Sequence, residues 1–196
     1  MKRFLLISTT LILLTACSVT EPISTKGEVV DCSSISVQGG TSEKLECLGG
    51  GSSIAPDGIK GPALINVWGT WCTQCRKELP HLIHFQQKSD GTVKLIGIAV
   101  EEKNQESVRE HIVKKGITWP ILYDKNDSTR AIFGMGVPVT WFIDQDGKAV
   151  YKKYGPFKSL EEIQLLVKKY LENAWSLTSF LRSLHWALSL LDLRMV

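Results

Sequence analysis

The fold of this chain is decided by the sequence WCTQCRKELP at residues 71–80, which follows the apolar run ALINVW at residues 63–68. A short continuous apolar run predicts a buried strand. Cys72 and Cys75 then stand at the start of a helix predicted for residues 72–87. A helix N-terminus carries a partial positive charge and free N–H groups, which favour a thiolate over a thiol. This cysteine pair is therefore suited to exchanging disulfides, because one cysteine attacks and the other resolves the mixed disulfide.

Strands and helices alternate along the rest of the chain, and a hairpin and a final helix follow them. Pro80 is expected to kink the first helix rather than end it. Gly116 is a typical residue after the end of a helix, and Asp146-Gly147 is a typical hairpin turn. This order predicts an α/β fold with a central mixed sheet and helices on both faces. The further predicted strands cover residues 93–100, 121–123, 139–143 and 148–154, and the further helices cover residues 104–115, 128–133 and 159–172.

The first residues indicate export. Lys2 and Arg3 precede an apolar run at residues 4–14, which is shorter than the roughly 20 residues that a membrane span needs. The run ends in LTAC at residues 14–17, which resembles the lipobox of bacterial lipoproteins. We therefore expect a signal peptide at residues 1–16, a lipidated Cys17 and a tether at residues 17–30, on the outer face of the bacterial cell membrane. The alternative is an ordinary cleaved signal with an incidental cysteine.

The formal net charge of +3 falls to +1 when Lys2 and Arg3 are removed, and no motif for nucleic acid is present. The chain has five cysteines, so a lipidated Cys17 leaves four. Cys32 and Cys47 flank a stretch rich in Ser and Gly, and we expect them to form a structural disulfide within residues 31–57. A second exchange pair that relays electrons to Cys72 and Cys75, or two free thiols, are the alternatives.

Together these residues resemble the thioredoxin-fold proteins of the TlpA, ResA and CcmG type, which are membrane-anchored extracytoplasmic thiol–disulfide oxidoreductases. The resemblance covers residues 58–171 and rests on WCTQC, on Glu78 and Pro80, and on GVPVTWFID followed by Asp146-Gly147. Residues 104–119 stand where this group carries an inserted helix and strand. The resemblance implies a thioredoxin-like domain at residues 58–173, with a central mixed sheet flanked by helices.

The resemblance also implies roles for single residues. Cys72, expected to be the more exposed cysteine, is the nucleophile, and Cys75 resolves the mixed disulfide. Pro138 stands in the cis-proline loop, which presents the backbone of Val137 to an incoming peptide; a plain turn proline is the alternative. Glu78 matches a carboxylate that tunes proton transfer from Cys75, although such a residue taken alone is more often a solvated helix residue.

Two residues depart from related proteins. Asn66 stands where cytoplasmic thioredoxins carry a buried acid, and its amide cannot accept a proton from Cys75, so this task passes to Glu78 or to water. Gln74 replaces a proline found in many relatives, which leaves the direction of the reaction open. Trp71 is expected to form a wall beside the thiols and to contact substrate, whereas Trp68 is expected in the core.

A zinc site does not fit this pattern. His81 and His84 follow the cysteine pair, but Cys75 and His81 stand roughly 9 Å apart along a helix that rises about 1.5 Å per residue. Both cannot reach one zinc ion at about 2.0–2.3 Å. We therefore expect no metal and no cofactor. The spacing around Cys72 also departs from the patterns typical of peroxidases and copper-delivery proteins of related fold.

The tail at residues 174–196 carries leucines at helical spacing, interrupted by Arg182 and His185, which argue against a membrane span. We expect a helix packed on the domain or on a second copy, or else an interfacial helix on the membrane. The resemblance implies that the protein keeps the haem-site cysteines of apocytochrome c reduced, supplied by a membrane electron donor of the CcdA or DsbD type. An oxidant or isomerase for exported proteins is the alternative, and a non-catalytic binding lipoprotein is the alternative from another class.

Overall fold

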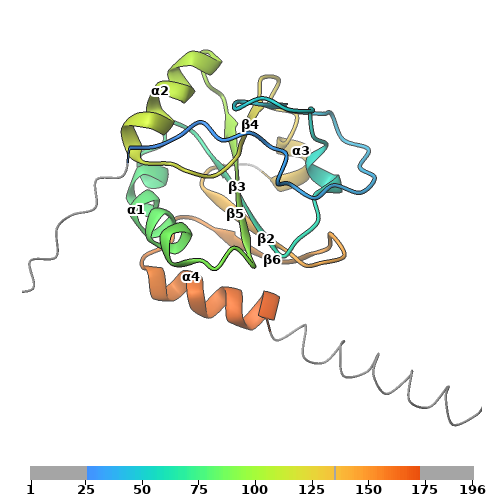
Figure 1. Ribbon diagram of the computed structural model, residues 1–196, viewed down its shortest axis with the longest axis vertical. Helices are drawn as coiled ribbons and strands as arrows, with labels where there is room; N and C mark the ends of the chain where they lie inside the picture. The colour runs from blue at the N-terminus through green and yellow to red at the C-terminus, as the bar shows by residue number, and fades with distance from the viewer. Residues whose placement is uncertain (1–25, 135, 173–196) are drawn as a thin grey trace, which may run out of the picture.

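A six-stranded sheet forms the centre of the part of the chain that the computed structural model describes, residues 26–134 and 136–172 (Figure 1). Its strands are β1 (Glu46–Cys47), β2 (Ala63–Trp68), β3 (Lys94–Val100), β4 (Ile121–Asp124), β5 (Val139–Ile143) and β6 (Ala149–Tyr154). The spatial order is β1-β4-β3-β2-β5-β6, in which β2, β3 and β4 run parallel and the other pairs are antiparallel. The predicted fold class, a mixed sheet with flanking helices, is confirmed.

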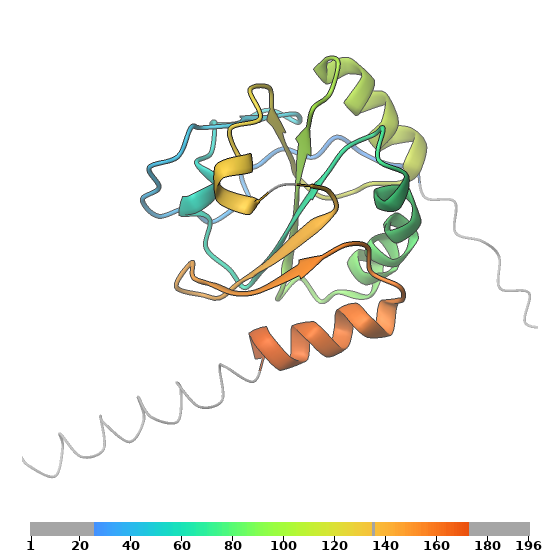
Figure 2. The same cartoon turned by 180° about the vertical axis from the view of Figure 1, so that it is seen from behind.

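Side chains of β2 alternate between the two faces of the sheet, as they do in any strand. Leu64 and Trp68 belong to one core cluster with α1, α2 and α4, whereas Ile65 and Val67 belong to a second cluster with α3 and the segment at residues 26–60. Figures 1 and 2 show these two layers on opposite sides of the sheet. The helices are η1 (Pro56–Gly58), α1 (Thr73–Lys88), α2 (Gln105–Lys115), α3 (Arg130–Phe133), α4 (Leu160–Val167) and η2 (Lys168–Glu172).

The long helices begin and end close to the predicted positions. The α1 helix continues through Pro80. Asn104 caps α2 by accepting a hydrogen bond from the Ser107 N–H, and Gly116 ends it with a φ of 79° in the left-handed region, which glycine adopts at low cost. The helix predicted for residues 159–172 is α-helical only to Val167, and its last residues form the π-helical turn η2.

The short helix predicted for residues 128–133 begins two residues later, at Arg130. The reason is Asp124 at the end of β4, whose buried carboxylate accepts hydrogen bonds from the backbone N–H and the hydroxyl of both Ser128 and Thr129. These bonds give the two residues a turn conformation instead of a first helical turn.

The segment at residues 26–60 contains structure that the sequence did not predict. The β1 strand pairs antiparallel with β4, and isolated bridges join Val37 to Ile59 and Leu45 to Ile54. The same segment also contains a disulfide between Cys32 and Cys47, the pair for which the sequence had indicated one. Cys17, the signal peptide and the tail at residues 174–196 lie outside the described residues. Within the described residues, no helix combines the length and the apolar character needed to span a membrane.

Candidate active site

The second disulfide of the described residues joins Cys72 to Cys75 at the N-terminus of α1, next to the carboxyl end of β2. Cys72 is the N-cap residue of α1, and its sulfur accepts a hydrogen bond from the Cys75 N–H at 3.0 Å. The loop before it is closed by a bond from the Cys72 N–H to the Gly69 carbonyl. The Cys75 N–H, a backbone donor of the first helical turn, therefore points at the Cys72 sulfur, where it stabilises negative charge.

The loop that leads into β5 lies against this sulfur. The Val137 carbonyl oxygen is 3.8 Å from Cys72 Sγ, and the peptide bond between Val137 and Pro138 is cis. The expectation that Cys72 is more exposed than Cys75 is wrong for this disulfide form, because each residue is 5% exposed. The Val137 carbonyl, 3.8 Å from Cys72 Sγ, covers part of Cys72.

Glu78 lies one helical turn beyond Cys75 and is buried, with only 1% of its surface exposed. It is therefore not a solvated helix residue. One carboxylate oxygen accepts a hydrogen bond from Asn66 Nδ2 at 2.9 Å, and the other accepts one from the Phe157 N–H at 3.1 Å. Burial raises the pKa of Glu78 from its ordinary value of 4.5 to about 7, although these two hydrogen bonds act in the opposite direction. The carboxyl is thus able to gain or lose a proton near neutral pH.

Asn66 connects this carboxyl to the sheet. Its amide nitrogen donates to Glu78 Oε1 and also to Thr140 Oγ1, each at 2.9 Å. Thr140 is directly opposite Asn66 in the register of β5 against β2. No sequence pattern indicated Thr140 or Phe157, because both reach this polar group from distant parts of the chain. The result is a buried polar chain from the centre of the sheet to the helix that carries the disulfide.

The loop between β2 and α1 is held by polar contacts on its outer side. The Glu102 carboxylate accepts hydrogen bonds from the Thr70 N–H and from Thr70 Oγ1, the latter at 2.7 Å. Arg76 donates to the Thr70 carbonyl at 3.0 Å. Trp71 is 50% exposed, and its indole N–H donates to the Val100 carbonyl at 3.3 Å. This bond fixes the ring as an exposed wall beside the disulfide.

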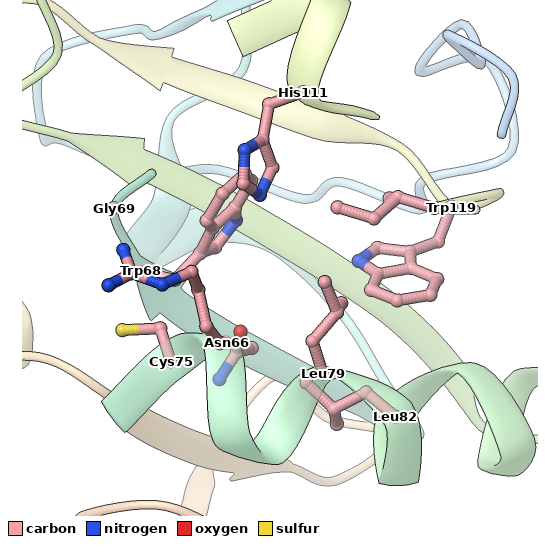
Figure 3. A pocket seen from close by; sticks show the side chains of 10 residues that line it. Asn66, Trp68, Gly69, Cys75, Leu79, Leu82, His111 and Trp119 are labelled. Carbon is pink, nitrogen blue, oxygen red and sulfur yellow. The ribbon is translucent and has the colours of Figure 1, made fainter. Parts of the chain in front are cut away.

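A small pocket lined partly by aromatic side chains lies between α1 and α2, and Cys75 forms part of its lining (Figure 3). The Trp68 ring forms one wall and packs against His111, with 5.6 Å between ring centroids. Burial lowers the pKa of His111, and the positive charges of Lys115, Arg76 and Lys114 lower it further, so the imidazole favours its neutral form. Trp119 also lines the pocket, and its indole N–H is buried without a hydrogen-bond partner in the described part of the chain. The remaining described lining is mainly apolar.

The structure brings together most of the residues singled out from the sequence. Cys72 and Cys75 form the disulfide, Val137 lies against Cys72 Sγ, and Pro138 and Trp71 are their chain neighbours. Glu78 lies one helical turn further along α1. Cys32 and Cys47 lie elsewhere, at the edge of the sheet formed by β1. His81 is partly buried and His84 is exposed on α1. Among residues 26–134 and 136–172, no three His, Cys, Asp or Glu side chains gather in a way that could hold a metal ion.

This fold and this site define a thioredoxin-like protein with a cysteine pair placed for thiol–disulfide exchange. The family model named Redoxin matches residues 43–165, and the chain belongs to that family. The chain is 30% identical over 122 residues to the thiol-disulfide oxidoreductase ResA of Bacillus thuringiensis strain Al Hakam, which covers 61% of this chain and 69% of the relative. It is also 30% identical over 105 residues to the thioredoxin-like protein YneN of Bacillus subtilis, which covers 53% of this chain and 62% of the relative.

Solved structures agree with this assignment. The crystal structure of StoA from Bacillus subtilis matches with a TM-score of 0.53 and 26% identity, over 63% of this chain and 93% of StoA. A thiol:disulfide interchange protein from Chlorobium tepidum matches in fold, with a TM-score of 0.56 and 24% identity over 69% of this chain and 97% of that protein. The protein is a thiol–disulfide oxidoreductase of the ResA and StoA type.

Proposed function

We propose that Cys72 is the nucleophile of this oxidoreductase and that Cys75 is the resolving cysteine. The Cys72 thiolate attacks one sulfur of a substrate disulfide and releases the other sulfur as a thiolate. Cys75 then attacks Cys72, which frees the second substrate thiol and leaves the Cys72–Cys75 disulfide. Two electrons pass to the substrate, and the protons lost by the two enzyme thiols balance those gained by the substrate thiols. The carrying observation is the hydrogen bond from the Cys75 N–H to Cys72 Sγ at 3.0 Å, because it stabilises the Cys72 thiolate.

Glu78 accepts the proton from Cys75 in this proposal. A general base works best when its pKa is close to the working pH, and the pKa of Glu78 is raised to about 7 by burial. Asn66 holds the carboxyl through its amide but cannot take a proton itself. Trp71, Val137 and Pro138 contact the substrate segment beside the disulfide. The position of Val137 supports this contact, because its carbonyl oxygen lies 3.8 Å from Cys72 Sγ.

The substrate in this proposal is a disulfide of an exported protein, and by family resemblance it is the haem-site cysteine pair of apocytochrome c. The protein acts on the extracytoplasmic face of the membrane, anchored through a lipid on Cys17, and a membrane donor of the CcdA or DsbD type returns it to the dithiol form. The support is the lipobox-like sequence LTAC and the similarity to ResA.

A second function, oxidation or isomerisation of disulfides in exported proteins, is favoured by one observation. Backbone donors that stabilise the Cys72 thiolate stabilise the reduced form, and a stabilised reduced form makes the disulfide more oxidising. The buried Glu78 opposes this tendency when it is ionised, because its negative charge disfavours a nearby thiolate.

The reduction potential of the Cys72/Cys75 pair separates the two functions. The full-length protein in detergent is equilibrated with glutathione or dithiothreitol buffers, and Cys32→Ser/Cys47→Ser is measured beside it so that only one pair titrates. We expect a value near or below about −250 mV, in the range of dedicated reductants. A value near about −120 mV would overturn the reductive function and identify a disulfide donor.

The proposed anchor has its own test. Cys17→Ser keeps the signal sequence but removes the thiol that receives the lipid, so we expect the protein to move from the membrane fraction to the soluble extracytoplasmic fraction. Ser18→Ala is the matched control and should stay with the membrane. Retention of Cys17→Ser in the membrane fraction would contradict the lipid anchor.

A further inference from the structure

A second pocket begins directly beside the exchange site, on the side of α3. Val137 lines this pocket, and its carbonyl is the group that lies 3.8 Å from Cys72 Sγ. Trp71, the residue before Cys72, forms another part of the lining. Val137 and Trp71 therefore belong both to this pocket and to the immediate surroundings of Cys72.

The floor of the pocket is apolar. Val67, Val100 and Phe133 line it, and each is buried, with exposures of 4%, 4% and 2%. The indole N–H of Trp71 is tied to the Val100 carbonyl, so the ring borders the floor. Such a surface favours the methylene groups of a side chain over a compact polar group.

The rim is charged and accessible to solvent. Arg130 pairs with both Glu101 and Asp127, and the side chains of the three are 45%, 43% and 33% exposed. Two carboxylates around one guanidinium leave a net charge of −1 at the opening. Glu101 and Asp127 have positive φ values of 54° and 56°, a conformation that non-glycine residues seldom adopt. Both carboxylates meet the same arginine.

We propose that this pocket is a specificity subsite for a lysine or arginine side chain next to the exchanging cysteine of the substrate. The methylene groups of that side chain pack on Val67, Val100 and Phe133, and its positive end meets Glu101 and Asp127. Arg130 limits the attraction, because it already neutralises one of the two carboxylates. This inference rests on the proposed reductive function, for which it names the substrate class: exported proteins with a basic residue flanking the disulfide.

The test measures how fast the pre-reduced full-length protein, freed of its reductant, reduces short peptides with a Cys-x-x-Cys disulfide. Lysine, norleucine or glutamate is placed next to the pair, before it in one series and after it in another. Each rate is divided by the rate with 2-mercaptoethanol, an uncharged thiol, which corrects for the reactivity of the peptide itself. In at least one series we expect lysine to react roughly 3- to 10-fold faster than glutamate, with norleucine between them. The ratio should shrink in about 1 M salt, where charges are screened beyond about 3 Å.

Two variants change this ratio in opposite directions. Glu101→Gln/Asp127→Asn removes both negative charges with little change of shape, and asparagine tolerates the backbone conformation of position 127. The ratio of lysine to glutamate should fall to about one or below, because Arg130 then stands alone. Arg130→Gln releases both carboxylates, so the ratio should rise. Glu106→Gln, which removes a more exposed carboxylate that pairs with Arg109 on α2, is the control and should leave the ratio unchanged.

Each outcome decides the inference. Equal corrected rates for the three peptides in both series, or a preference for glutamate, overturn it even if the variants do not fold, because the unmodified protein alone gives this answer. Bis(2-hydroxyethyl) disulfide, which carries no flanking residue, tests the proposed function separately. Failure to reduce it at all counts against the exchange chemistry, whereas reduction without a peptide preference counts against the subsite alone.

Discussion

The two disulfides of the described chain have different surroundings, although both connect short segments of one sheet protein. The Cys72–Cys75 bond lies at a helix N-terminus, against the Val137 carbonyl and one helical turn from the buried carboxyl of Glu78. The Cys32–Cys47 bond joins a loop to the edge strand β1, and both of its cysteines are buried. A disulfide becomes an exchange site when neighbouring groups stabilise a thiolate and manage its proton, and it remains a structural link when they do not.

The regions around the two disulfides also differ in the behaviour of one carboxyl group each. Glu78 is buried, and burial raises its pKa to about 7, so it changes its charge near neutral pH. Asp57, in the segment that carries Cys32 and Cys47, accepts hydrogen bonds from the backbone N–H and the hydroxyl of both Thr41 and Ser42. These bonds hold the pKa of Asp57 well below its ordinary value, so it stays charged. One carboxyl is buried and has a raised pKa, and the other organises an exposed polar loop.

The largest expected effect is on activity, which should depend on the Cys72–Cys75 pair and not on Cys32 and Cys47. Cys72→Ser removes the proposed nucleophile, so reduction of a peptide disulfide should fall to the uncatalysed rate. Cys32→Ser/Cys47→Ser removes the other disulfide at a distant edge of the sheet, and its rate should stay within roughly twofold of the unmodified protein. Stopped-flow measurement of peptide reduction provides both rates. Loss of activity in the second variant, with an unchanged far-UV spectrum, would instead support an electron relay through Cys32 and Cys47.

The next effect concerns Glu78 and pH. The folded chain holds a proton at Glu78 that the unfolded chain releases above pH 4.5, because the pKa of the folded form is higher, at about 7. The contribution to stability is therefore complete below pH 4.5 and is lost as the pH rises through about 7. A difference of this size in pKa amounts to about 3 kcal/mol in the free energy of unfolding.

Glu78→Gln carries no charge, so this part of the pH profile should disappear in the variant. The free energy of unfolding of the oxidised protein is measured with urea at several values between pH 4 and pH 8. The contribution of Glu78 is the difference between the profile of the unmodified protein and that of Glu78→Gln. Glu110→Gln, on the exposed face of α2, is the matched control and should leave the profile unchanged. Parallel profiles for the unmodified protein and Glu78→Gln would show that Glu78 ionises without cost, and would remove it as a base with a raised pKa.

The third effect tests, through stability, whether the bond between Cys32 and Cys47 is structural. Cys32 and Cys47 are 15 residues apart, so their bond restricts the unfolded chain much more than the bond between Cys72 and Cys75, which are three residues apart. Cys32→Ser/Cys47→Ser should therefore lose about 2–3 kcal/mol of unfolding free energy. Cys72→Ser/Cys75→Ser should lose clearly less. Equal losses measured by urea unfolding would contradict this division between a structural and an exchanging disulfide.

The elements around the exchange site were predictable because their signals are local. The apolar run of β2, the cysteine at the N-cap of α1 and the Asp146-Gly147 turn each occupy a few consecutive residues. The β1 strand was not predictable. It is two residues long, lies in a polar segment and exists because its backbone pairs with β4.

The surroundings of Glu78 show the same limit within the site. The sequence indicated the residue, but its burial depends on the Phe157 N–H, 79 positions further along the chain, and on the pairing of Asn66 with Thr140 across two strands. The ion pairs of Arg130 with Glu101 and Asp127 likewise depend on where β3 ends relative to α3. Contacts between distant segments leave no pattern in a single sequence, so the chemistry of the cysteine pair was predictable and its electrostatic setting was not.

The smallest expected effect tests the carboxylate of the structural region. Asp57→Asn keeps one acceptor oxygen and loses the other, which leaves the donors of Thr41 or Ser42 without their partner. The site is exposed, so water replaces part of the lost bonding and the free energy of unfolding at pH 7 should fall by only about 1 kcal/mol. Because the folded-state pKa of Asp57 is lowered, the unmodified protein gains its contribution above about pH 4 and loses it as the pH falls further.

The difference in the free energy of unfolding between Asp57→Asn and the unmodified protein should therefore become smaller as the pH falls. At Glu78 the expected contribution instead becomes smaller as the pH rises. Asp90→Asn is the matched control, because Asp90 is exposed and its hydrogen bonds are local, such as the one from the Thr92 N–H, so the substitution should change stability less. A difference that stays constant down to pH 2 would mean that the carboxylate contributes through shape and not through charge. Ionisation would then affect stability at Glu78 alone, and the opposite pH dependence expected for the two carboxyl groups would not hold.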